Sequence, residues 1–151
     1  MSDARWFEID NVVASAVRHF SGAATIFATF PGTNDRYMAE MAFQHAMLAG
    51  HTSLEQALVR ILELLQERPP TGARSHADLI ARARSAFDNR PPILTGDIGV
   101  AADETRRFRS VAAHAYDNFD EARAVAAVAS ARVLASGLAA EIARLKGIVD
   151  P

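Results

Sequence analysis

Residues 120–147 read DEARAVAAVASARVLASGLAAEIARLKG, and the spacing of their apolar side chains indicates the fold class. Apolar residues recur every three or four positions, which places them along one face of an α-helix. We therefore expect one long helix here, with Asn118 and Glu121 available to cap its start. The residues expected to face inward are Val125, Val128, Val133, Leu134, Leu138, Ile142 and Leu145.

The same spacing recurs towards the N-terminus. A first helix, capped by Ser2 or Asp3, is expected to end where Pro31 and Gly32 break the pattern. A second series passes through Gly50 without losing its phase, which favours one long helix, kinked at most at that glycine. The members of this second series are Met38, Met41, His45, Leu48, Leu58, Ile61, Leu62 and Leu65. The segment 52–55, TSLE, also looks like a capping box, the sign of a helix start after the glycine.

Two proline-containing loops enclose a short helix. It is expected to start at Ser75, with Asp78 at the capping-box position. Its apolar face comprises Leu79, Ile80, Ala83 and Phe87. After the second loop, Thr95 or Asp97 opens another helix that ends near residues 116–120. No alternating pattern typical of a strand occurs, so residues 1–151 are predicted to form a single all-α domain, an antiparallel bundle of four main helices plus a short one.

Composition narrows the classes of function. The net charge of −2 argues against a protein that coats nucleic acid non-specifically, so any RNA contact requires a local basic site. The absence of cysteine excludes disulfides, thiolate nucleophiles and cysteine metal sites, and the histidines show no metal-binding spacing. His19, His45 and His51 are expected to be packed or surface residues. Neither a leader nor a membrane span is expected, which predicts a cytoplasmic protein. No metal ion or cofactor is expected either.

The segment RFRSVAAHAY, residues 107–116, contains the candidate functional residues. Arg109, His114 and Tyr116 occur there in a predicted helix made otherwise mainly of alanine and valine. Histidine suits acid or base work near neutral pH, and the arginine fork suits a phosphate. Residues five apart on a helix diverge by about 140°, so Arg109 and His114 of one ideal helix do not point at one atom. Either the helix ends before His114, or two copies converge across a dimer axis. A purely structural alternative pairs Arg109 with Glu104 or Asp117 and packs Tyr116 under the turn.

The spacing R-x-x-x-x-H-x-Y resembles the signature of HEPN domains, the small helical bundles found in prokaryotic RNA-cleaving toxins. The tyrosine is similar to that of the HepT-like subgroup, and the flanking segments 75–83 (SHADLIARA), 90–94 (RPPIL) and 104–116 (ETRRFRSVAAHAY) also resemble it. This chain departs from the pattern at Ser110, where HEPN nucleases often carry asparagine, aspartate or histidine. His76 inherits no catalytic role from the match and is expected to make a structural contact at a helix start.

The resemblance implies a toxin of a type VII toxin–antitoxin system that acts as a metal-independent endoribonuclease. Arg109 and His114 are then catalytic residues in the shared groove of a homodimer, and Arg106 and Arg107 attract the RNA substrate. The implied antitoxin is a minimal nucleotidyltransferase that attaches AMP to Tyr116. Two alternatives remain: a non-catalytic HEPN module that binds nucleotide or docks the nucleotidyltransferase, and a plain helical interaction protein.

Overall fold

A computed structural model describes residues 3–114 and 119–151, and gives the backbone alone for residues 113 and 114. The regular structure of the described residues is helical and contains no strand, which confirms the predicted fold class. The elements are α1 (Arg5–Ala28), a 3₁₀ helix η1 (Phe30–Gly32), α2 (Arg36–Leu64), α3 (Ser75–Ala83), α4 (Gly96–His114) and α5 (Glu121–Val149).

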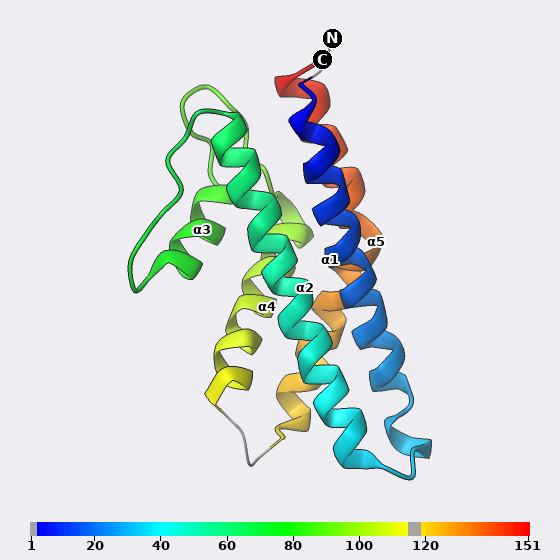
Figure 1. Ribbon diagram of the computed structural model, residues 1–151. Helices are drawn as coiled ribbons and strands as arrows, with labels where there is room; N and C mark the ends of the chain where they lie inside the picture. The colour runs from blue at the N-terminus through cyan, green and yellow to red at the C-terminus, as the bar shows by residue number, and fades with distance from the viewer. Residues whose placement is uncertain (1–2, 115–118) are drawn as a thin grey trace.

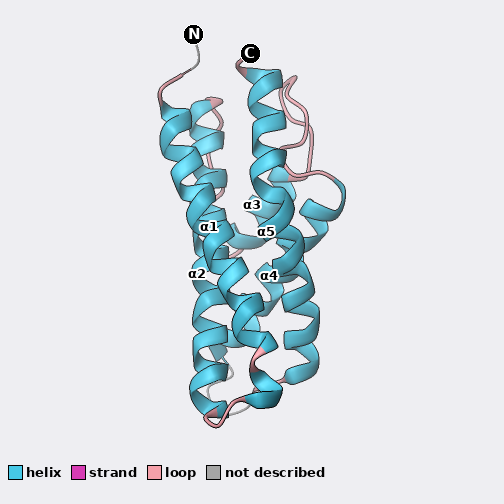
Figure 2. Cartoon of the chain, turned by 90° about the vertical axis from the view of Figure 1, so that its right-hand side faces the viewer, coloured by secondary structure: helices cyan, strands magenta, loops and turns pink. Residues whose placement is uncertain are grey.

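Four helices form an antiparallel bundle, and the short α3 lies outside it (Figure 1). Helix α1 packs against α2 and α5, and α4 packs against α5 and α2, so the four long helices enclose one core. Helix α3 contacts α4 and α2 and lies beside them on the outside of the bundle (Figure 1). After a turn of 90°, the described elements are again seen as helices joined by loops, with no strand (Figure 2). The two ends of the chain meet, because the Asp150 carboxylate accepts hydrogen bonds from the Asp3 backbone N–H at 2.7 Å and from Trp6 Nε1 at 3.0 Å.

The first half of α2 buries a different face from the one predicted. Met38 is 59% exposed and Met41 is 49% exposed, and His45 also faces outward, whereas Phe43 and Met47 are buried. Large apolar residues occur on two opposite faces of this segment, Met38 and Met41 on one and Phe43 and Met47 on the other, so spacing alone does not select the buried face. The prediction of one uninterrupted helix through Gly50 is confirmed, and the capping-box interpretation of residues 52–55 is wrong, because they lie inside α2.

Two other predicted core residues lie at the surface. Val125 is 53% exposed, because alanines occupy the buried positions at the start of α5 and let its backbone approach the neighbouring helices. Phe87 is 43% exposed, because α3 already ends at Ala83. The Ala83 carbonyl accepts the backbone N–H groups of Ile93 and Leu94, at 2.8 and 3.0 Å, so the following loop turns back onto the helix end.

Acidic side chains cap two of the long helices. Asp35 accepts the Met38 backbone N–H at 3.0 Å, and Asp120 accepts the Arg123 backbone N–H at 3.2 Å. The predicted cap Asn118 lies outside the described residues, and Asp120 is the N-cap of α5. At the start of α4, Thr95 donates from both its backbone N–H and its hydroxyl to Glu141, each at 2.8 Å. These contacts fix where α4, which carries the motif, begins.

A cluster of phenylalanines fixes the far end of α4. The Phe43 ring lies 5.7 Å from the Phe108 ring and 6.1 Å from the Phe119 ring, measured between centroids, in edge-on geometry. Phe30 lies 5.7 Å from Phe119. Such edge-to-face pairs add to the burial of apolar area, so α2, α4 and the start of α5 are held together beside Arg109.

Among the described helices, α5 is long and apolar enough to cross a membrane, judged by length and composition alone. It nevertheless contributes Leu134, Leu138, Ile142 and Leu145 to the core between α1 and α4. This burial is typical of a bundle helix, and the absence of a membrane span stays a prediction.

Gly50 permits a close contact between α1 and α2. A Cβ atom at this position would lie 2.8 Å from two ring atoms of Phe20, which is itself completely buried. The missing side chain therefore lets the aromatic ring pack directly on the α2 backbone.

We expect Gly50→Ala to lower the free energy of unfolding by about 1–3 kcal/mol, because the new methyl group overpacks the contact with Phe20. Gly22→Ala is the matched control. Gly22 also lies inside a helix, but a Cβ atom there meets nothing within 4 Å, so alanine should stabilise by about 0.5–1 kcal/mol. Urea denaturation followed by circular dichroism measures both, and equal effects at the two glycines would contradict this account.

Candidate functional site

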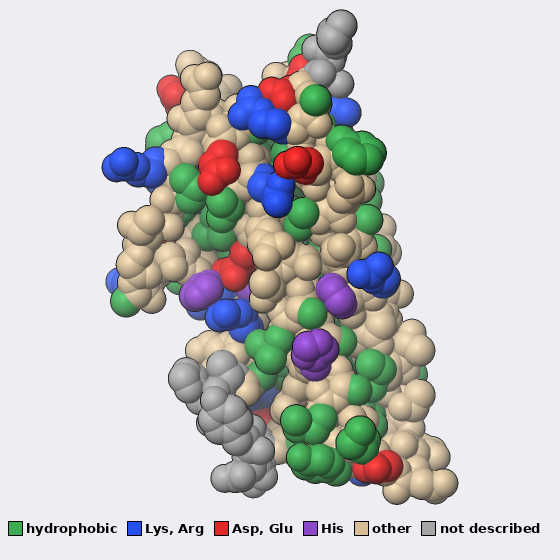
Figure 3. All heavy atoms as spheres, viewed as in Figure 1, with side chains coloured by type: hydrophobic (Ala, Val, Ile, Leu, Met, Phe, Trp, Pro, Cys, Tyr) green, Lys and Arg blue, Asp and Glu red, His purple; other side chains and the backbone are tan. Residues whose placement is uncertain are grey.

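One pocket contains three of the residues that the sequence singled out for function or for contacts. It lies between the start of α3 and the second half of α4, with a volume of about 330 Å³. On the face drawn in Figure 3, a histidine, an acidic and a basic side chain meet where α3 lies beside α2 and α4. The lining residues are Ala73, Arg74, His76, Ala77, Arg106, Arg109 and Ser110. They include three arginines and no carboxylate, which favours an anionic ligand.

Arg109 is the motif residue that the structure describes fully. Within the described part of the chain, its buried Nε atom has no hydrogen-bond partner and its side chain forms no ion pair. In particular, the alternative pairing with Glu104 is not formed. Asp117, the other of the two partners in the structural alternative, lies outside the described residues. A buried N–H without a partner costs free energy, and an acceptor oxygen in the pocket would satisfy it.

Arg106 and Arg107 differ in position. Arg106 lines the pocket and holds an ion pair with Asp103 at 2.9 Å. Arg107 pairs with the other oxygen of Asp103 at 3.1 Å, is 64% exposed and is not among the lining residues. Of the two predicted RNA-binding arginines, the structure thus brings only Arg106 together with Arg109.

The other two motif residues fall at or beyond the limit of the described chain. Helix α4 continues through His114, so the possibility that it ends before this residue is wrong. On a continuous helix, the directions of positions 109 and 114 around the axis differ by about 140°. The side chain of His114 and the whole of Tyr116 lie outside the described residues.

A buried polar chain that sequence reasoning missed reaches the same pocket. The Thr105 hydroxyl donates its one hydrogen to the Ala102 carbonyl at 3.0 Å, so it accepts from His51 Nδ1 at 2.8 Å. His51 Nε2 lies 3.6 Å from Glu55 Oε2, too far for a hydrogen bond, and has no hydrogen-bond partner among the described residues. The same oxygen of Glu55 lies 2.6 Å from His76 Nδ1. Four side chains from α2, α3 and α4 are thereby neighbours in one row.

Glu55 is the centre of this chain of contacts. Burial raises the pKa of its carboxyl group, but the neighbouring imidazoles of His51 and His76 outweigh burial and lower the pKa below its usual range. Glu55 is therefore a carboxylate at neutral pH, and a carboxylate only accepts hydrogen bonds. The one local signal in the sequence was the spacing of four between His51 and Glu55, which places both on the same side of a helix.

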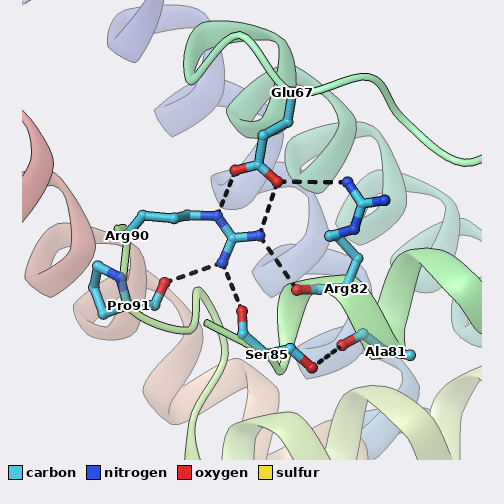
Figure 4. A network of polar contacts seen from close by, with 6 residues as sticks. All are labelled: Glu67, Ala81, Arg82, Ser85, Arg90 and Pro91. Carbon is cyan, nitrogen blue, oxygen red and sulfur yellow. Dashed lines mark hydrogen bonds and ion pairs between the residues drawn. The ribbon is translucent and has the colours of Figure 1, made fainter. Parts of the chain in front are cut away.

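A buried ion pair holds α3 in place (Figure 4). Arg90 Nε and Nη2 donate to the two carboxylate oxygens of Glu67 at 2.5 and 3.0 Å, and both side chains are at least 95% buried. The same guanidinium donates to the backbone carbonyls of Arg82, Ser85 and Pro91. The pair therefore ties both proline-containing loops to the end of α3, and so sets the wall of the pocket.

A larger hollow lies beside this pocket but is built differently. Its volume is about 520 Å³, and all of its lining residues belong to α2. A hollow on one helix face lacks the converging groups of a site. Within the described part of the chain, no group of three histidine, aspartate or glutamate side chains could hold a metal ion.

The helix order, Arg109 and His114 on α4 and the arginine-lined pocket define a small helical bundle of the HEPN type. A family model described as HepT-like protein matches residues 42–149, which is most of the chain. The chain belongs to the HepT-like family. No curated protein and no solved structure matches it.

We expect Glu67→Ala to lower the free energy of unfolding by about 3–5 kcal/mol, because it leaves the buried Arg90 guanidinium without its counter-charge. Glu8→Ala is the control, since Glu8 also pairs with an arginine, Arg60, at 2.7 Å, but both side chains are largely exposed. That loss should stay below about 1 kcal/mol. Chemical denaturation compares the two, and a loss below 1 kcal/mol for Glu67→Ala would show that the pair does not anchor α3.

Proposed function

We propose that this protein is a metal-independent endoribonuclease that acts as the toxin of a toxin–antitoxin pair. The observation that carries the proposal is Arg109, which lines a pocket with two other arginines and whose buried Nε has no partner among the described residues. Membership of the HepT-like family and the resemblance of the motif to that of HEPN ribonucleases support the same reaction class. Arg109 holds the phosphate and stabilises the charge that builds on its oxygens during cleavage.

His114 is the second residue of the proposed chemistry, as the acid or base of the cleavage step. Because α4 is continuous, Arg109 and His114 of one chain diverge, which supports a groove shared by two copies of the chain. Arg106 and Arg107 add positive charge around this groove and attract the RNA, although Asp103 offsets part of that charge.

We further propose that a minimal nucleotidyltransferase neutralises the toxin by attaching AMP to Tyr116. Tyr116 follows His114 by two positions, close to the end of α4. An added phosphate would pair with Arg109 and repel the backbone of an RNA, so a single modification would block the site.

We expect Arg109→Ala and His114→Ala each to lower the rate of RNA cleavage at least about a hundredfold. The measurement is cleavage of a labelled RNA in the presence of a metal chelator, with light scattering on the same samples to test for twice the mass of one chain. Arg132→Ala, on the exposed side of α5, is the matched control and should cleave at the wild-type rate. Wild-type protein that binds RNA or nucleotide without cleaving it would instead indicate the non-catalytic role.

We expect the intact mass of the protein to rise by one or more AMP units when it is expressed with its genomic neighbour. Tyr116→Phe should abolish this increase, because the phenylalanine ring offers no hydroxyl group. Tyr37→Phe is the control, since Tyr37 is 69% exposed and lies in the first turn of α2. An increase that persists in Tyr116→Phe would place the modification elsewhere.

A further inference from the structure

His76 has the surroundings of an acid–base group. It lies in the first turn of α3, its side chain is about half exposed, and its Nδ1 atom is 2.6 Å from Glu55 Oε2. Because the Glu55 carboxylate only accepts hydrogen bonds, Nδ1 of His76 carries the hydrogen. In the neutral ring, Nε2 then has a free lone pair that can accept a proton.

Glu55 is itself fixed in position. Its side chain is 12% exposed and lies between two histidines, the exposed His76 and the fully buried His51. His51 is anchored by its hydrogen bond to Thr105, which stands one helical turn before Arg109 on α4. The four side chains therefore form a row from the core to the pocket: Thr105, His51, Glu55 and His76. Because Glu55 is held in this row, its carboxylate orients the imidazole ring of His76. A carboxylate that orients a histidine in this way is the usual support of a general base.

His76 faces the place where a phosphate would bind. It lines the pocket together with Arg106, Arg109 and Ser110 of α4, and with Arg74 at the start of α3. Arginines in this arrangement hold a phosphodiester, and a base beside the phosphodiester reaches the ribose that carries it. The pocket therefore combines a phosphate site with a proton acceptor within one chain.

We propose that His76 is the general base of RNA cleavage, a role that rests on the proposed function. Its Nε2 takes the proton from the ribose 2′-hydroxyl. The 2′-oxygen then forms a bond to phosphorus, and the bond from phosphorus to the 5′-oxygen of the next nucleotide breaks. The products are a 2′,3′-cyclic phosphate and a 5′-hydroxyl, and the 5′-oxygen receives its proton from His114 of the second copy. His114 thus acts as the acid and His76 as the base.

Charged groups from three helices surround His76. Glu55 contacts its ring, Arg74, Arg106 and Arg109 line the same pocket, and Asp103 pairs with Arg106. The fully buried His51 lies on the far side of Glu55. A general base works only while it is neutral, so protonation of His76 at low pH stops cleavage and produces the acid limb of the rate profile.

The decisive variant is His76→Asn. An asparagine amide can donate to Glu55 in place of Nδ1, which keeps the structural contact, but it cannot take up a proton. We expect its rate of RNA cleavage to fall at least about a hundredfold, with an unchanged thermal midpoint and without the acid limb. His45→Asn, on the exposed side of α2, is the control and should keep the wild-type profile.

A second measurement uses His76→Ala with added imidazole. Recovery of cleavage with rising imidazole, and no recovery of Arg109→Ala under the same conditions, would support the proton-transfer role. If His76→Asn cleaves RNA at the wild-type rate with its acid limb intact, the base assignment is overturned while the proposed function stands. If the wild-type protein does not cleave RNA, the proposed function and the base assignment are overturned together. The wild-type protein is therefore measured first, before any variant is compared with it.

Discussion

The buried pair of Glu67 and Arg90 is the constraint on which the functional face of this bundle depends. Two charges removed from water are tolerated only when they meet each other and when their remaining hydrogen-bonding groups are satisfied. Arg90 meets both conditions, through the Glu67 carboxylate and through three backbone carbonyls at the end of α3 and in the loop after it. Two loops that have little regular structure are thereby held at fixed positions, and α3 is held against α4.

The two sides of α4 differ in how their polar groups are satisfied. Towards the core, Phe108 packs against Phe43, and Thr105 holds His51. Towards α3, Arg109 lines a pocket, and its buried Nε has no hydrogen-bond partner among the described residues. A buried donor that is left without a partner beside other cations retains capacity for a ligand. In this bundle, the open donor belongs to the motif arginine.

The fold class could be predicted because it depends on local periodicity, which survives in almost any context. The orientation of individual helices could not be predicted equally well. In the first half of α2, large apolar residues occur on two opposite faces, and the face with Phe43 and Met47 is buried because α1 approaches α2 at Gly50. At Phe87 the reason is different: α3 ends early because the Ala83 carbonyl accepts hydrogen bonds from the returning loop.

By itself, the sequence determined the all-α class, the number of long helices and the presence of Arg109, His114 and Tyr116 on and after one helix, because these features are set by spacing along the chain. Tertiary structure alone decided that Arg109 shares its pocket with His76, and that Glu55 connects His76 to the buried His51. His51 and Glu55 share one helix, but His76 is separated from Glu55 and from Arg109 by loops without periodicity. The contacts of His76 depend on where the Arg90 pair closes those loops, and no local pattern specifies a contact between side chains so far apart in the chain.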